Sequence, residues 1–213
     1  MTTTIPITKA ILSTADLKRR FALYPNADPN FFPEWHQDLP ELTPVEIEAL
    51  DRLHQRFALH REQGSLSEGA VDKLLISPLL DLVGFYEPEF RVRTEETVHY
   101  ALEGDEEILR GRIDTLIVQD QIWVLVVEAK RTIMVSLAVP QALADMMGNP
   151  HPDRPVYGLV SNGDEFIFLK LTATPPAEYS ASKLYSLFFP LANRELYEVF
   201  QILKHLKAAI APS

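Results

Sequence analysis

GRIDTLIVQDQIWVLVVEAKR, residues 111–131, contains two apolar runs separated by a short polar break. The runs at residues 113–118 and 122–127 are rich in Ile, Val, Leu and Trp, a composition typical of strands that are buried on both faces. The break consists of Gln119, Asp120 and Gln121. We therefore predict two core strands joined by a tight turn, with the rest of the domain built around them.

Three charged residues interrupt this hairpin: Asp114, Glu128 and Lys130. A charge within a buried strand is unfavourable unless it is paired or binds a cation. A turn of three residues would place Asp114 opposite Val126, with Glu128 as the diagonal neighbour on the same face, roughly 7–8 Å away. An even-numbered turn without a bulge would place the two carboxylates on opposite faces of the sheet.

Clustered carboxylates raise each other's pKa unless a divalent cation neutralises them, and hard oxygen ligands suit Mg²⁺ or Mn²⁺. A lysine two residues after Glu128 would orient or deprotonate a metal-bound water, or stabilise charge on a phosphate. The alternative is that Asp114, Glu128 and Lys130 are solvated residues at strand ends, the last two as a surface ion pair. The apolar run leads directly into Glu128, which favours the metal site.

Asp114, followed by Glu128, Ala129 and Lys130 at the end of the next strand, resembles the core motif of the PD-(D/E)xK nucleases. More narrowly, residues 44–208 resemble the N-terminal nuclease domain of type I restriction endonuclease R subunits and of short bacterial, often cyanobacterial, proteins of the same kind. The resemblance implies an α/β fold with a restriction-endonuclease-like core, in which helices flank a mixed central β-sheet. It implies that Asp114, Glu128 and the Ala129 carbonyl hold Mg²⁺, which Mn²⁺ can replace. Lys130 would then assist the attack of water on a DNA phosphodiester.

Residues 65–85 are predicted to form a helix that begins with Ser67 as its N-cap, kinks at Pro78 and ends at Gly84. Glu68 shares one face of this helix with apolar residues at the 3.6-residue period, namely Val71, Leu75, Leu79 and Leu82. An acid on a core-facing stripe either complements the helix dipole or reaches the metal site. The resemblance favours the second role, because relatives carry a glutamate at the matching position of the first core helix.

Residues 136–147 are predicted to form a helix with Gln141 near its start. Gln141 resembles a glutamine in the helix that follows the Glu-x-Lys motif of the restriction subunits, which implies a catalytic role. Two departures are present: Asp145 replaces the family's tyrosine four positions later, and Ile113 stands where the nuclease motif has a proline. The alternative is that Gln141 is an ordinary exposed helix residue.

The formal net charge of −10 counts against broad, non-specific binding to duplex DNA, which usually relies on a basic surface. A local basic cleft is compatible with that charge. Arg110 and Arg112 share a strand face with Asp114 by parity, and Arg131 follows Lys130. We expect these three arginines to bind phosphates, or alternatively to neutralise nearby carboxylates.

Residues 1–43 are interpreted as a proline-rich arm, and residues 44–213 as the nuclease-like domain. The aromatic residues of the arm are expected to pack on the rest of the chain: Phe31, Phe32 and Trp35. The domain is expected to begin with a helix capped by Thr43, Pro44 and Glu46. Further strands are predicted at residues 90–101, 155–161, 165–171 and 182–189, with a turn at Asn162-Gly163 and a last helix at residues 191–210.

The chain has no cysteine and no apolar run long enough to span a bilayer, so we expect a cytoplasmic protein without a membrane partner. It has no P-loop motif, so any motor or specificity subunit would act in trans. Cutting both strands of a duplex often takes two sites, which leaves a homodimer open. The intact Asp114, Glu128 and Lys130 set favours a Mg²⁺-dependent DNA endonuclease. The acidic charge favours the alternatives, a non-catalytic nuclease-fold module for nucleic-acid binding or assembly with a partner subunit, or a structural metal site.

Overall fold

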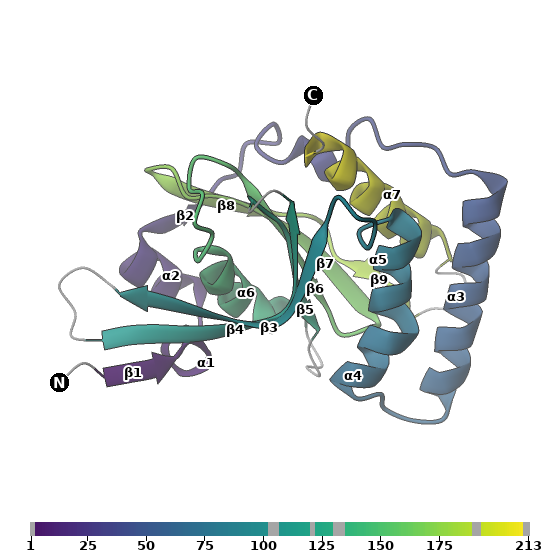
Figure 1. The fold of residues 1–213 in the computed structure, drawn as a ribbon, viewed down its shortest axis with the longest axis horizontal. Coiled ribbons are helices and arrows are strands. Elements are labelled where there is room, and N and C mark those ends of the chain that lie inside the picture. The colour runs from purple at the N-terminus through teal and green to yellow at the C-terminus, as the bar shows by residue number, and fades with distance from the viewer. Residues whose placement is uncertain (1–2, 102–106, 120–121, 130–134, 189–192, 211–213) are drawn as a thin grey trace.

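The computed structural model describes residues 3–101, 107–119, 122–129, 135–188 and 193–210. At residues 3, 101, 122, 124–129, 193 and 210 it describes the backbone alone. Within these ranges the chain forms one mixed sheet with helices packed on both of its faces (Figure 1). The expected α/β architecture, in which helices flank a mixed central sheet, is therefore confirmed.

The sheet has nine strands within the described ranges, and consecutive strands in the order β1-β4-β5-β6-β7-β8-β2 are hydrogen-bonded to one another. In addition, β3 pairs with β4 and β9 pairs with β7. The β1–β4, β5–β6 and β2–β8 pairs are parallel, and the other pairs are antiparallel. The bounds are β1 (Thr3–Pro6), β2 (Leu23–Pro25), β3 (Arg91–Ala101), β4 (Glu107–Gln119), β5 (Ile122–Ala129), β6 (Val156–Ser161), β7 (Glu165–Thr172), β8 (Ala177–Ala181) and β9 (Tyr185–Ser186).

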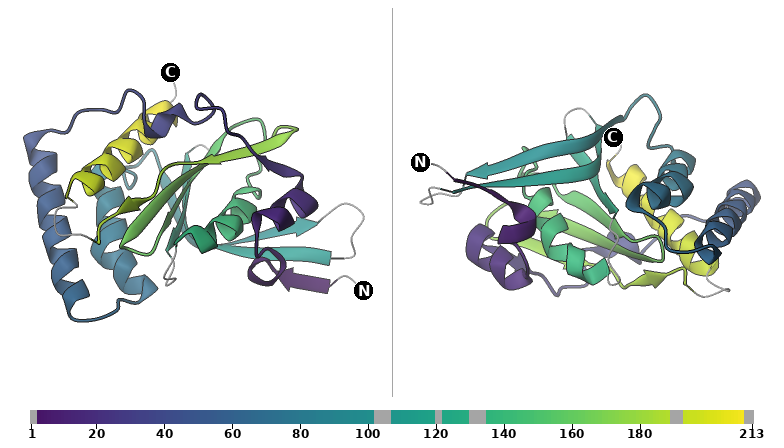
Figure 2. Two further views of the ribbon diagram at one scale, coloured as in Figure 1. Left: turned by 180° about the vertical axis from the view of Figure 1, so that it is seen from behind. Right: turned by 90° about the horizontal axis from the view of Figure 1, so that it is seen from below.

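Two groups of helices cover the two faces of this sheet, and each group builds its own hydrophobic core. Figure 2 shows α1, α2 and α6 together on one side and α3, α5 and α7 on the other. Successive residues of the central strands contribute to opposite cores, as the alternation of a strand requires. The bounds are α1 (Ile7–Ala10), α2 (Thr14–Phe21), α3 (Pro44–Glu62), α4 (Glu68–Val71), α5 (Ser77–Val83), α6 (Val139–Met146) and α7 (Asn193–Ile210), with short turns η1 (Pro33–Trp35) and η3 (Val135–Ala138).

The helix-end signals in the sequence are confirmed. Thr43 caps α3 in a capping box with Glu46, in which each side chain accepts a hydrogen bond from the other residue's backbone N–H. Ser67 accepts a hydrogen bond from the backbone N–H of Ala70 at the start of α4. Gly84 ends α5 in the left-handed conformation with a φ of 86°, which glycine adopts without a steric penalty.

The helix that contains Pro78 differs from the prediction in one respect, because it includes a π-turn. The π-turn η2 (Asp72–Ile76) joins α4 to α5, and the N–H of Ser77 donates to the carbonyl of Asp72, five residues earlier. The wider turn changes which side chains face the core after it. Leu82, expected on the buried stripe, is 42% exposed, and its neighbour Val83 is buried instead.

The first 43 residues are more regular than their proline content indicated, since β1, α1, α2, β2 and η1 all fall within them. β1 joins the sheet beside β4, and β2 joins it beside β8. The expected packing of the arm's aromatics on the same chain is confirmed: Phe32 is 1% exposed, and Phe31 and Trp35 pack against the same core. The strand expected at residues 182–189 is largely wrong, since only β9 forms within the described part of that range, residues 182–188, and β8 was not predicted.

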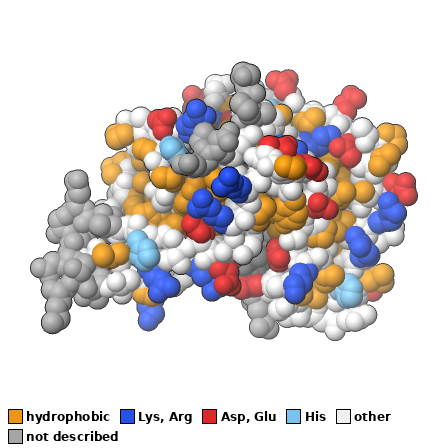
Figure 3. All heavy atoms as spheres, in the orientation of Figure 1, with side chains coloured by type: hydrophobic (Ala, Val, Ile, Leu, Met, Phe, Trp, Pro, Cys, Tyr) orange, Lys and Arg blue, Asp and Glu red, His pale blue; other side chains and the backbone are white. Residues whose placement is uncertain are grey.

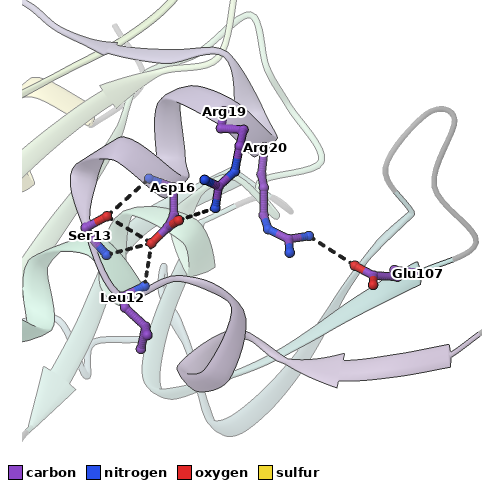
Figure 4. A network of polar contacts seen from close by, with 6 residues as sticks. All are labelled: Leu12, Ser13, Asp16, Arg19, Arg20 and Glu107. Carbon is purple, nitrogen blue, oxygen red and sulfur yellow. Dashed lines mark hydrogen bonds and ion pairs between the residues drawn. The ribbon is translucent and has the colours of Figure 1, made fainter.

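Helix α2 is fixed at both ends by polar contacts, which Figure 4 shows. At its start Ser13 and Asp16 form a capping box, and at its end the Arg20 guanidinium donates to a carboxylate oxygen of Glu107 at 3.2 Å. Glu107 begins β4, so this ion pair ties the N-terminal segment to the strand that carries Asp114. Among the helices that the structure describes, none combines the length and the hydropathy needed to cross a membrane.

Candidate active site

Strand β4 has three neighbouring strands, so two of them must share one of its edges. β3 runs along one edge over nearly the whole strand. On the other edge, β1 pairs with β4 up to Arg110 and β5 pairs with it from Thr115. The residues between, 111–114, have no strand partner on this edge in the ladders that the structure describes, so the sheet forks there.

A cavity of about 380 Å³ opens at this fork. It is lined by five side chains that sequence patterns had singled out, from three elements that lie far apart in the chain: Glu68, Arg110, Arg112, Asp114 and Gln141. Glu68 is the first residue of α4, Gln141 lies in the first turn of α6, and the other three alternate along β4. The fold thus brings these five side chains to one cavity, which their positions in the sequence did not show. Their chemical roles stay predictions.

The register of β4 and β5 corrects the expected position of Asp114. Gln119 pairs with Ile122, which leaves an even-numbered turn, and the register then shifts at Ile117/Val118. This bulge compensates for the even turn, so that Leu116 rather than Asp114 lies opposite Val126. The ladder ends with the pair of Thr115 and Val127, and the same register extended by one residue would set the backbone of Glu128 opposite Asp114.

Several of the predicted groups lie outside the described residues. Lys130 and Arg131 are among them, and at Glu128 and Ala129 only the backbone is described, paired with Val160 and Ser161 of β6. Within the described side chains, no group of three or more His, Cys, Asp or Glu residues is arranged to hold a metal ion. The side chain of Glu128, the predicted partner ligand of Asp114, lies outside the described side chains.

Asp72 is a carboxylate beside the site that the sequence patterns did not single out. Burial raises the pKa of Asp72, and the negative charge of Asp114 adds to the rise. The hydroxyl of Ser77 lies 3.4 Å from each carboxylate oxygen of Asp72, and its hydrogen bond lowers the pKa of Asp72 against this rise. The Tyr86 hydroxyl in turn donates to Ser77 Oγ at 3.0 Å. The signal was present: Asp72 follows Glu68 by four residues, which places both on one helical face.

Asp145, where the family resemblance expects a tyrosine, also lines the cavity and is 5% exposed. Its carboxylate packs against Gly111 of β4 so closely that a Cβ at position 111 would overlap Asp145 Oδ1. The hydroxyl of Tyr100 donates to the backbone carbonyl of Asp145 at 2.8 Å. Burial raises the pKa of Tyr100, and the charge of Asp145 raises it further. A glycine within a strand is the sequence signal of such a close approach.

The two arginines of β4 have little to hold them in the described part of the chain. Arg110 is exposed and has no ion pair with any residue that the structure describes. Arg112 lies 3.7 Å from Glu95, but both side chains are largely exposed, so this pair stabilises the fold little. Both guanidinium groups therefore remain available to an anionic ligand in the cavity.

These features define an α/β protein with a carboxylate-lined cavity at a fork in its sheet. No family model matches the chain, and no curated protein matches it. Among solved structures, the chain is loosely similar to the fragment structure of a putative HsdR subunit of a type I restriction enzyme from Vibrio vulnificus YJ016. That match has 20% sequence identity and a TM-score of 0.37, and it covers 63% of this chain but only 25% of the other. At this level of similarity it assigns no activity.

Proposed function

We propose that this protein is a Mg²⁺-dependent endonuclease that hydrolyses phosphodiester bonds in DNA. The observation that carries the proposal is the fork of β4, where one cavity collects Asp114, Glu68 and Gln141 with two arginines. Carboxylates, an amide and guanidinium groups around one cavity are the groups that hold a divalent cation and a phosphodiester. The resemblance of Asp114, Glu128 and Lys130 to the nuclease motif points to the same chemistry.

The donor set fits a hard divalent cation in kind. Asp114 is half-buried and lies near Asp72, and the pKa of Asp72 is raised by burial and by the charge of Asp114. A divalent cation would relieve such a concentration of negative charge. Asp114, Glu128 and the Ala129 carbonyl are the groups that would hold Mg²⁺, and Mn²⁺ would substitute for it. When bound, the cation would act as a Lewis acid on the phosphate.

The other residues of the site would position the water and the DNA. Lys130 would hold the attacking water or take up its proton, and Glu68 would orient the site from the start of α4. Arg110 and Arg112 would grip the phosphates on either side of the scissile bond, in keeping with their exposure at the cavity. Gln141 would orient the strand from α6.

The second candidate is a non-catalytic module that binds nucleic acid or joins a partner subunit, and the charge of the chain favours it. The formal net charge is −10, and Figure 3 shows basic and acidic side chains interspersed on one face of the molecule. A motor or specificity subunit that acts in trans is compatible with either candidate function. A cytoplasmic location and a homodimer remain parts of the proposal.

The test is cleavage of labelled single- and double-stranded DNA with Mg²⁺ or Mn²⁺ by the full chain. Asp114→Ala and Lys130→Ala should each abolish cutting, and Asp153→Ala, an exposed aspartate that does not line the cavity, should leave it unchanged. Circular dichroism would confirm that the variants fold. Wild-type protein that cuts neither substrate, or cutting that survives Asp114→Ala, would contradict the proposal and favour the binding module.

A further inference from the structure

The cavity has two chemically different sides. Its walls include Pro6 and Ile7, which come from the N-terminal segment and are apolar. Gln141 and Asp145 lie four residues apart on α6, hence on one helical face, and both line the cavity. The arginines of β4 lie on the opposite strand face from Gly111, against which Asp145 packs. The cavity thus joins a side with charged side chains, those of Arg110, Arg112 and Asp114, to a side with an apolar wall and hydrogen-bonding groups.

A buried carboxylate in a site for a polyanion restricts what the ligand can place beside it. Asp145 is 5% exposed, and an ionised carboxylate only accepts hydrogen bonds. A phosphate there would be repelled, whereas a group with N–H donors would be attracted. The part of the ligand that reaches Asp145 must therefore be a hydrogen-bond donor attached to a flat or apolar body that fits against Pro6 and Ile7.

A nucleobase that carries an exocyclic amino group has these properties. Cytosine and adenine present such an amino group, and thymine does not. Acidic side chains accept hydrogen bonds from the amino group of cytosine, and glutamine binds adenine through its amide. In a duplex the base-pairing edge is occupied, so only a base outside a duplex offers it to a protein pocket. The volume of about 380 Å³ lies in the range of small-ligand pockets.

We propose that this cavity receives one base of single-stranded or locally opened DNA, and that Asp145 and Gln141 select cytosine or adenine over thymine. Arg110 and Arg112 then hold the phosphates that flank this nucleotide. The inference rests on the proposed function, because it names the substrate class of the same cavity.

The experiment measures binding rather than turnover, and no metal is added. Fluorescence anisotropy would compare the full chain with labelled decamers of deoxycytidine, deoxyadenosine and deoxythymidine. The cytidine and adenosine decamers should bind on the order of tenfold more tightly than the thymidine decamer. Asp145→Asn supplies N–H donors that the O4 atom of thymine accepts, so it should bring the ratio close to one. Asp153→Asn, which is exposed and outside the cavity, should keep the wild-type ratio.

Because Asp145 is buried, a second variant protects the test against a folding defect. Gln141→Met changes a half-buried residue of nearly the same size, and it should weaken adenosine binding more than thymidine binding. Equal binding of the three decamers by the wild type, binding of none, or an unchanged ratio in both variants would overturn the inference. Base preference without cleavage would contradict the nuclease proposal alone, and cleavage without base preference would contradict the base pocket alone.

Discussion

Replacing Gly111 by alanine tests the close approach on which the cavity depends. A Cβ at this position would lie 2.7 Å from Ile7 Cδ1 and 2.8 Å from Val98 Cγ2, and it would overlap Asp145 Oδ1. These three atoms belong to α1, β3 and α6, which pack around Gly111 from different directions. No single side-chain rotation therefore makes room for the methyl group.

The expected cost follows from the number of contacts that must move. Inserting a methyl group into a well-packed region costs about 1–3 kcal/mol. For a domain of this size each kcal/mol lowers the melting temperature by about 2–4 °C, so Gly111→Ala should melt about 2–12 °C below the wild type. The smaller entropy of the unfolded alanine variant offsets part of this cost, by roughly 0.4–1 kcal/mol.

Urea and thermal unfolding, followed by circular dichroism, would measure the change. Gly69→Ala is the matched control: Gly69 lies in α4 with nothing within 4 Å of its Cβ position, so alanine should stabilise the helix by up to about 1 kcal/mol. The same chemical change is thus expected to have opposite signs at the two positions. A Gly111→Ala protein as stable as the wild type would refute the close packing of Ile7, Val98 and Asp145 around Gly111.

A double-mutant cycle identifies the group responsible. Asp145→Ala removes the nearest of the three neighbours, so Gly111→Ala should cost less in that background, with a coupling of about 0.5–2 kcal/mol. Costs that add without coupling would show that the carboxylate of Asp145 does not lie against Gly111. Such a result would also count against the proposal that the cavity binds a base, because that proposal requires the Asp145 carboxylate in the cavity.

Two further changes test how the rest of the chain holds the sheet together. Burial raises the pKa of Glu34, but the hydrogen bonds that Lys170 and Tyr157 donate lower it by more, so the folded-state pKa lies below the unfolded-state pKa. A carboxyl group of this kind stabilises the fold at pH values above its unfolded-state pKa, and this stabilisation is lost as the pH falls through the folded-state pKa. Glu34→Gln should therefore lower the free energy of unfolding by about 1–3 kcal/mol at pH 7, and urea titrations should show this difference from the wild type disappearing below about pH 4. Glu87→Gln, at an exposed position, should show no such pH dependence. Lys207→Met should lower stability by about 0.5–1.5 kcal/mol, because the ammonium donates to a carbonyl at the C-terminus of α5; an unchanged midpoint of urea unfolding would contradict this.

Local signals in the sequence specified the elements around the site. The helix starts at Thr43 and Ser67, the stop at Gly84 and the turn at Gly163 are each fixed by interactions within a few residues, so the residues alone reveal them. The apolar runs at residues 113–118 and 122–127 likewise predicted β4 and β5, although β4 begins at Glu107, six residues before the first run.

The shape of the site depended on contacts that no local pattern contains. Sequence parity could not say whether the turn after Gln119 was even or whether a bulge followed it, and both were needed to set Leu116, rather than Asp114, opposite Val126. The π-turn that begins at Asp72 arises where Pro78 interrupts the helix ladder, and it moved Leu82 out of the core.

By itself, the sequence determined the helix ends, the two core strands and a set of polar residues placed along them. Only the tertiary structure decided that β1 and β5 share one edge of β4, which opens the cavity and brings Glu68, Asp114 and Gln141 to its wall. It alone placed Asp145 against Gly111. The physical reason is that capping and alternation act between neighbours in the chain, whereas strand pairing and close packing act between segments that only the folded chain brings together.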